Sequence, residues 1–331
     1  MAAEDQRMTD RISQRFHTFA AQEADGRSPL YAALARGVAA DAPTLAFLAA
    51  LPPEKQQPNL LFAALRHVCG TPSDWPAART ALAERADAVR QVMLQRRTQT
   101  NEPARCAMLL PVLAGLAQPL ALLEVGASAG LCLLPDRYGY RYGAHSLPPP
   151  GEGAPVFACE VSPDVPLPPQ APVVAWRAGL DLAPVDVHDP GQCAWLETLV
   201  WPEHAGRLAR LRAALAVARA DPPPVHRGDL LTGLAALAAA APAEATLVVF
   251  HTAVLAYLPG ADRARFAATV GGLRAVWISN ESPSVFPGIA ERVRRPGPVG
   301  AFLLAVDGTP VAWTHPHGEW IAWLQPEDVS A

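Results

Sequence analysis

The residues best suited to chemistry in this chain begin at the stretch 122–131, which reads Leu-Leu-Glu-Val-Gly-Ala-Ser-Ala-Gly-Leu. Apolar residues lead into Glu124, and glycines then alternate with small residues. This order is typical of a buried parallel strand and a tight turn, in which Gly126 takes a positive φ and Gly130 lets a helix approach the strand. Free N–H groups at such a turn attract anions and polar cofactors. Three chemistries use it: dinucleotide binding, S-adenosylmethionine (SAM) binding, and a nucleophile elbow with Ser128 as the attacking residue.

Two further acids follow later apolar runs. Asp181 and Asp229 end the second and third strands predicted for this half of the chain. Because the carboxyl ends of parallel strands meet at one edge, we expect both to lie near Glu124 and to accept hydrogen bonds from a ligand. Glu160 is the alternative to Asp181 if residues 156–160 form the second strand.

Three other side chains are candidates for catalysis or substrate binding. His251 closes the fourth predicted strand and titrates near neutral pH, which suits a general base, and Glu281 follows the fifth strand. Arg105 is a candidate for holding a carboxylate of the cofactor or the substrate.

Metal and lysine chemistry are not predicted. The five cysteines lack Cys-x-x-Cys spacing, and the segment from His315 through His317 to Glu319 resembles a turn more than a metal site. Lys55 is the only lysine and no lysine follows Gly130, so the turn is not a phosphate-binding loop of the Walker type.

The elements that must position these residues change character along the chain. Residues 1–118 show helical periodicity, and we expect a helical N-terminal cap subdomain there. Residues 119–331 alternate strands with helices, the first helix running from Gly130 to about Asp136, with a proline-rich insertion at about 144–172. An Asp-Gly hairpin closes the series. The predicted fold class is α/β: a Rossmann-like doubly wound sheet with a reversed hairpin edge, preceded by an all-helical subdomain.

Chain order and spacing separate the three chemistries. A hydrolase elbow follows several strands and an oxyanion loop, whereas more than a hundred mostly helical residues precede Ser128 here. In a dinucleotide fingerprint the last glycine comes later than Gly130. SAM binding fits the strand ends best.

Composition limits the partners. A net charge of −4 with 18% charged residues argues against broad phosphate neutralisation, so we expect no nucleic-acid partner. No apolar run is long enough to span a bilayer, and residues 1–15 lack an apolar signal core. We therefore expect a cytoplasmic protein that acts on a small molecule without a membrane partner, in an oligomeric state that the sequence leaves open.

The chain resembles the class I SAM-dependent methyltransferases, whose first motif is an acid followed by x-Gly-x-Gly-x-Gly. Glu124, Gly126 and Gly130 match this motif, and Ser128 stands in place of the middle glycine. The resemblance implies SAM as cofactor, with Asp181 on the ribose hydroxyls and Asp229 at the adenine amino group.

More closely, the chain resembles an uncharacterised bacterial family within that superfamily, over nearly its whole length. The segments that carry this resemblance are 100–102, 124–131, 136–143, 199–202 and 250–255. The family resemblance names no substrate. A SAM-dependent methyltransferase is therefore expected, with a non-catalytic SAM-binding or interaction module as the alternative and a serine hydrolase using Ser128 as the weaker one.

Overall fold

The computed structural model describes residues 2–99 and 101–330, and these form two compact units. The first contains residues 2–99 and 194–208, and the second contains residues 101–193 and 209–330. The first unit is helical and the second holds a large, mostly parallel sheet, which confirms a mixed α/β chain with an N-terminal helical region. The helix Cys106–Gly115, which we grouped with the N-terminal helices, belongs to the second unit.

The first unit packs its helices around aromatic side chains. Its elements are α1 (Ala2–Phe19), a π-helical turn (Ala20–Ala24), α2 (Pro29–Ala40), α3 (Ala42–Ala49), η2 (Pro53–Lys55), α4 (Pro58–Cys69) and α5 (Trp75–Gln95). Ser28 caps the beginning of α2, because its hydroxyl accepts a hydrogen bond from the N–H of Tyr31. Phe62 of α4 contacts the rings of Phe16 and Tyr31 in the core, and Trp195 of the returning segment joins the same core.

No single helix among residues 2–99 and 101–330 is long and apolar enough to cross a membrane. Helices α2 and α3 reach that length and hydropathy only together, and the chain bends by 86° between them. Leu34 and Val38 of α2 are buried in the core of the first unit.

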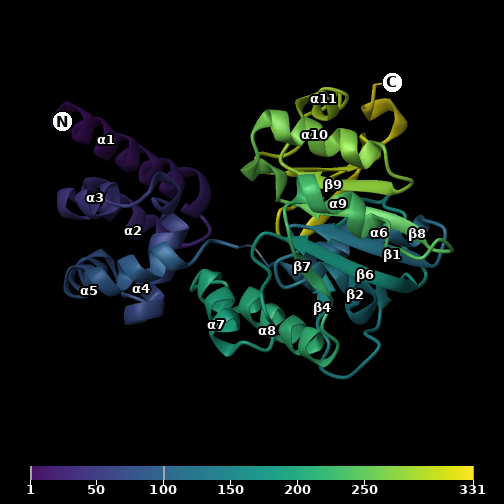
Figure 1. The fold of residues 1–331 in the computed structure, drawn as a ribbon, viewed down its shortest axis with the longest axis horizontal. Coiled ribbons are helices and arrows are strands. Elements are labelled where there is room, and N and C mark those ends of the chain that lie inside the picture. Colours follow the sequence, from purple (N-terminus) through teal and green to yellow (C-terminus); the bar gives the residue numbers. More distant parts are fainter. Residues whose placement is uncertain (1, 100, 331) are drawn as a thin grey trace. The chain divides into compact units, whose positions relative to one another are not determined.

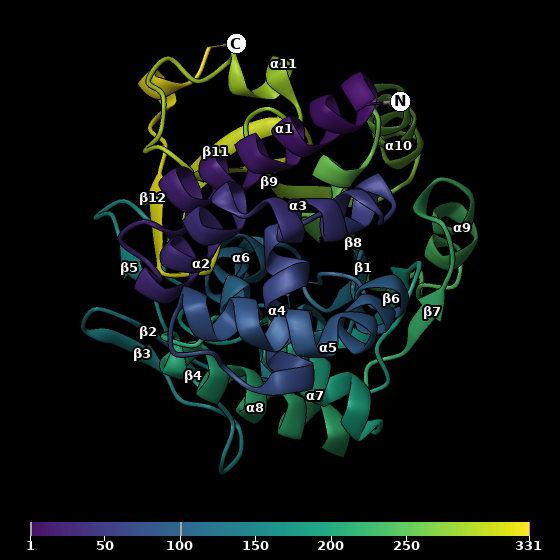
Figure 2. The same ribbon diagram turned by 90° about the vertical axis from the view of Figure 1, so that its left-hand side faces the viewer.

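The second unit is built on a nine-stranded sheet with the order β5-β12-β11-β10-β9-β8-β1-β6-β7. Figure 2 shows β5 and β12 at one edge of this sheet and β7 at the other. The strands of the sheet are β1 (Leu120–Val125), β5 (Glu160–Val161), β6 (Val174–Asp181), β7 (Val225–Arg227), β8 (Thr246–Thr252), β9 (Val276–Glu281), β10 (Phe302–Val306), β11 (Thr309–Thr314) and β12 (Trp320–Trp323). A small second sheet holds β2 (Gly139–Tyr142), β3 (His145–Leu147) and β4 (Val156–Ala158).

The helical elements of the second unit are mostly short (Figure 1). They are η3 (Pro103–Arg105), α6 (Cys106–Gly115), η4 (Leu131–Leu133), η5 (Pro135–Arg137), α9 (Leu230–Ala238), η6 (Leu255–Tyr257), α10 (Gly260–Gly271), α11 (Pro287–Ala290) and η7 (Pro326–Asp328). Two further helices, α7 (Pro190–Leu199) and α8 (Ala205–Ala220), contain the points where the chain passes between the units.

The order of the parallel strands reverses at β1. From β1 the chain builds β6 and β7 on one side, and it then returns to build β8 and β9 on the other. In open α/β sheets this reversal opens a crevice at the carboxyl ends of the central strands, where ligands bind. Side chains alternate between the two faces of the sheet: Leu123 and Val125 pack with Leu234 and Phe266 of α9 and α10. Glu124 therefore points to the opposite face.

The helix predicted from Gly130 to about Asp136 is absent, and that prediction was wrong. Two 3-10 turns, η4 and η5, occupy the segment instead. Pro135 explains the difference, because proline lacks an N–H and disfavours the helical conformation of the residue before it. Leu134 accordingly leaves the helical region, with φ −113° and ψ 36°.

Strand pairing decides which acid ends the second strand of the sheet. β6, which ends in Asp181, pairs in parallel with β1. Glu160 lies in β5 of the proline-rich insertion, which pairs with β12 at the far edge. The Asp307–Gly308 turn between β10 and β11 forms as predicted, with positive φ at both residues.

Candidate functional site

Glu124 is the most unusual residue of the sheet. It lies one position before the end of β1, its exposed fraction is 5%, and its Oε2 atom is buried without a hydrogen-bond partner among residues 2–99 and 101–330. Burial raises the pKa of Glu124 well above its ordinary value; Cys132 and Asp181 raise it further, and Arg105 lowers it. Burial of this carboxyl group therefore disfavours its charged form. A buried polar group without a partner is costly, and this cost makes Glu124 a candidate binding residue.

The loop after β1 turns sharply at two glycines. Gly126 has φ +71° and Gly130 has φ +68°, a region that side chains with a Cβ atom rarely adopt. A Cβ atom on Gly126 would lie 2.4 Å from Cγ2 of Val254, and one on Gly130 would lie 2.6 Å from Cγ of Pro223. Both glycines are therefore required by the packing of the loop itself.

Replacing Gly126 with alanine should lower the free energy of unfolding by about 2–4 kcal/mol, because a strained backbone adds to a steric clash. Gly143 is the matched control: its φ is +59°, but nothing lies within 4 Å of a Cβ added there. The Gly143→Ala variant should lose only about 1 kcal/mol. Urea denaturation of both variants measures the difference, and equal losses would show that Val254 yields to the added methyl group.

Ser128 also has a left-handed backbone, with φ +51°. All three of its polar groups are held by the protein. Its N–H donates to Oδ2 of Asp181 (2.8 Å), its carbonyl accepts from the N–H of Val185 (3.0 Å), and its Oγ accepts from Nδ2 of Asn101 (2.9 Å). The hydroxyl thus meets an amide and no imidazole among the described residues, which gives no support to Ser128 as a nucleophile.

The other two predicted acids both bind backbone N–H groups. Asp181 accepts from Ser128 through Oδ2 and from Ala183 through Oδ1 (2.7 Å), so it fixes the loop after β1 to the end of β6. Asp229 is exposed and caps α9 by accepting from Leu231 (2.7 Å). Each carboxylate oxygen has a second lone pair, so both acids still have capacity to accept from a ligand.

Arg105 is 4% exposed and links two other loops at this edge of the sheet. Its Nε donates to the carbonyl of Pro316 (2.8 Å), and Nη1 donates to the carbonyl and hydroxyl of Thr252 (3.0 and 3.2 Å). Pro316 follows β11 and Thr252 ends β8. The guanidinium therefore holds the end of β8, one strand away from Glu124.

His251 and Glu281, predicted separately, lie side by side on the face away from Glu124. Nδ1 of His251 is 2.8 Å from Oε1 of Glu281, and Nε2 accepts from the indole N–H of Trp277 at 3.0 Å. Because an indole can only donate, the ring proton of His251 resides on Nδ1 and is donated to Glu281. Both side chains are buried, and both ring nitrogens are engaged.

Glu281 also shapes the turn after β8. Oε1 accepts from the N–H groups of Val254 (2.9 Å) and Leu255 (3.1 Å), while Oε2 is buried and has no partner in the described part of the chain. Burial acts to raise the pKa of Glu281, but the hydrogen bonds from His251 and from the N–H groups of Val254 and Leu255 together hold it below its ordinary value. The turn that carries Val254, the residue packed on Gly126, is therefore fastened by an ionised carboxylate.

Two polar residues of this edge were missed from the sequence. Asn101 lies in the segment 100–102 that carries the family resemblance and was not predicted as a site residue, yet it binds the Ser128 loop. Asn280 is fully buried on β9; its Oδ1 accepts from the hydroxyl of Thr314 (2.7 Å), and no described residue accepts from its Nδ2. Its position directly before Glu281 at a strand end was the available signal.

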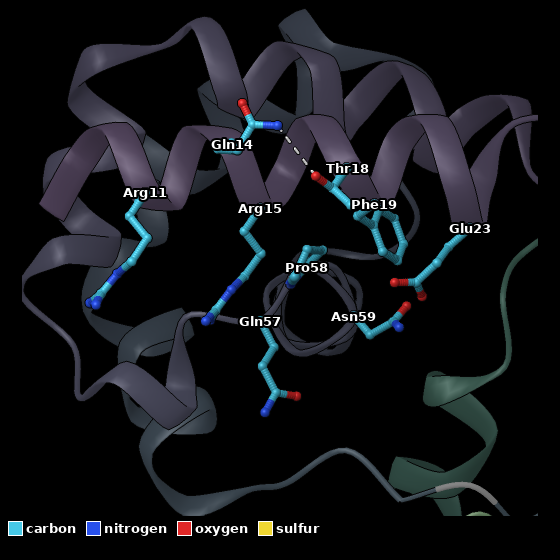
Figure 3. Close-up of a pocket in the computed structure, with 9 residues that line it drawn as sticks. All are labelled: Arg11, Gln14, Arg15, Thr18, Phe19, Glu23, Gln57, Pro58 and Asn59. Atoms are coloured by element: carbon cyan, nitrogen blue, oxygen red, sulfur yellow. Dashed lines mark hydrogen bonds between the residues drawn. The ribbon is translucent and has the colours of Figure 1, made fainter. Parts of the chain in front are cut away.

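A separate cavity of about 570 Å³ lies within the helical unit. Figure 3 shows Arg11 and Arg15 of α1 at one end, Glu23 at the other, and Pro58 of α4 between them. It contains none of the residues predicted for the cofactor or for catalysis. The orphaned Glu124 carboxyl group therefore remains the stronger indication of a binding site.

Fold and site together define a mixed α/β protein with buried polar side chains at the carboxyl ends of β1 and β8. The family model described as "Uncharacterized protein conserved in bacteria (DUF2332)" matches residues 13–323, so the chain belongs to this family. No curated protein and no solved structure matches the chain.

Proposed function

We propose that this protein binds SAM at the carboxyl edge of β1 and β8 and transfers its methyl group to a small molecule. The observation that carries the proposal is Glu124, a buried carboxyl group whose Oε2 has no partner. An ammonium group is the complement of such a carboxylate, and the amino-acid end of SAM carries one. The order of the strands supports the same position, since it puts Glu124 beside the reversal at β1.

The other predicted site residues would each contact a different group of SAM. The Gly126–Gly130 loop would back the methionyl and ribose groups, Asp181 would accept from the ribose hydroxyls, and Asp229 would accept from the adenine amino group. SAM supplies an electrophilic methyl group. Arg105 would hold the end of β8 in place beneath the ligand through Thr252.

Proton removal from the acceptor is the step assigned to His251 and Glu281. In the structure the lone pair on Nε2 of His251 is committed to Trp277. For His251 to accept a proton, that bond must first break. This engagement favours the second candidate function, a SAM-binding module without catalysis.

Titration calorimetry with SAM tests the binding proposal. We expect saturable binding of SAM and much weaker binding of 5′-methylthioadenosine, which lacks the amino-acid end. Equal affinities for the two compounds would remove the role of Glu124, and no heat at millimolar SAM would refute the proposed cofactor. Incubating the protein with methyl-labelled SAM and a metabolite extract then separates the enzyme from the module, since only the enzyme labels a product.

A further inference from the structure

The backbone of Ser128 is held in a conformation that a non-glycine residue does not adopt without cost. A left-handed φ at such a residue strains the backbone and persists only where the surroundings enforce it. The usual residue in a turn of this kind is glycine, which would avoid the cost. The serine must therefore contribute a contact that glycine cannot make.

That contact is the hydrogen bond between Oγ of Ser128 and Nδ2 of Asn101, at 2.9 Å. The same amide binds the next residue, because Oδ1 of Asn101 accepts from the N–H of Ala129 at 3.1 Å. Asn101 thus holds one side chain and one backbone group of the loop through both ends of its amide. It belongs to the same compact unit as the loop and lies just before η3.

Asp181 holds the loop from the other side by accepting from the N–H of Ser128. The loop is therefore fixed by two side chains that come from different segments of the second unit. Glu124 lies four residues before Ser128, at the base of the same loop. Movement at Ser128 would shift the backbone that faces the proposed cofactor.

We propose that Asn101 is a positioning residue that holds the Gly126–Gly130 loop in the conformation that receives the cofactor. Ser128 replaces the middle glycine because its hydroxyl accepts the hydrogen bond from Asn101. The identity of the ligand rests on the proposed function. The role of Asn101 in fixing the loop rests on its two hydrogen bonds, to Ser128 and Ala129.

Three variants test this inference: Asn101→Ala, Asn101→Asp and Ser128→Ala. Alanine at 101 removes both contacts. Aspartate keeps an acceptor for the N–H of Ala129 and can accept from the Ser128 hydroxyl, which then becomes the donor. Alanine at 128 removes the side-chain contact only, and it provides a second route to the result if Asn101→Ala does not fold.

The readouts are hydrogen exchange of the Ala129 amide and the Kd for SAM. We expect Asn101→Ala to speed exchange at Ala129 and to raise the Kd about tenfold, as the loss of one to two hydrogen bonds implies. Ser128→Ala should have a smaller effect in the same direction. Asn101→Asp should stay within about threefold of the wild type, since it preserves both contacts. Exchange at Leu122 in β1 serves as the internal reference for global stability.

Unchanged exchange at Ala129 in the Asn101→Ala variant would overturn the proposal. The proposal would also be overturned if Asn101→Asp showed the same increases in Ala129 exchange and in the Kd for SAM as Asn101→Ala. Aspartate retains both hydrogen bonds, so these bonds would then not be what positions the loop. If the wild type does not bind SAM, the proposed function fails, and the exchange measurement still decides whether Asn101 fixes the loop.

Discussion

Replacing Glu124 with glutamine is expected to raise the Kd for SAM about 10- to 100-fold, the range that loss of one charge-assisted hydrogen bond implies. The amide has nearly the same size and can still accept a hydrogen bond, so the change removes mainly the charge. Glu160→Gln is the matched control, because Glu160 is exposed on β5 at the far edge of the sheet. Calorimetry should find its Kd unchanged.

The Glu124→Gln substitution should also remove the pH dependence of the affinity for SAM. The raised pKa of Glu124 means that the carboxyl group must lose a proton before it can pair with an ammonium group. Wild-type affinity should therefore rise by up to about tenfold per pH unit until the pH passes that raised pKa, and the glutamine variant should show no such rise. Parallel pH profiles for the two proteins would contradict the assignment of the ammonium group to Glu124.

Stability gives an independent check on Glu124. A carboxyl group whose pKa is raised on folding contributes stability that is complete below its ordinary value of 4.5 and is lost as the pH rises through the raised value. The Glu124→Gln variant avoids this loss. Its thermal midpoint should match that of the wild type in acid and exceed it increasingly as the pH rises toward neutrality.

Replacing His251 with phenylalanine should lower the free energy of unfolding by about 3 kcal/mol, because breaking a buried pair leaves its partners unsatisfied. Trp277 would lose the acceptor for its indole N–H, and Glu281 would lose its strongest partner. His226→Phe is the matched control, since His226 is an exposed residue of β7. Urea denaturation compares the two variants.

The stability lost in His251→Phe should depend on pH, and the pKa of Glu281 gives the direction of that dependence. Its lowered pKa contributes stability that is present above the ordinary value of 4.5 and is lost as the pH falls through the lowered value. The difference between the wild type and His251→Phe should therefore be largest near neutral pH and should shrink in acid. A His251→Phe variant no less stable than His226→Phe would show that the pair contributes little to the fold.

Local patterns accounted for much of the fold. Short apolar runs ending in polar residues predicted β1, β6, β8 and β9, and the Asp307–Gly308 pair predicted the turn between β10 and β11. The helix wrongly predicted after Gly130 could also have been excluded from the local sequence. Pro135 lies within the predicted helix, and a proline generally disfavours a helical conformation at the residue before it, here Leu134.

Long-range pairing accounts for what the sequence did not reveal. His251 and Glu281 are 30 residues apart, and only the alignment of β8 with β9 brings them together with Trp277. Asn101 and Ser128 meet because the segment before η3 returns to the loop after β1. Nothing in either segment alone indicates that contact.

The crystal structure of the protein with S-adenosylhomocysteine tests the central claim most directly. We predict that the ligand lies over the Gly126–Gly130 loop, with its amino group hydrogen-bonded to Glu124 and its ribose hydroxyls at Asp181. A ligand that binds elsewhere, for example in the cavity beside Arg15, would contradict the claim. So would the absence of bound ligand at the carboxyl ends of β1 and β8 at ligand concentrations far above the Kd measured in solution.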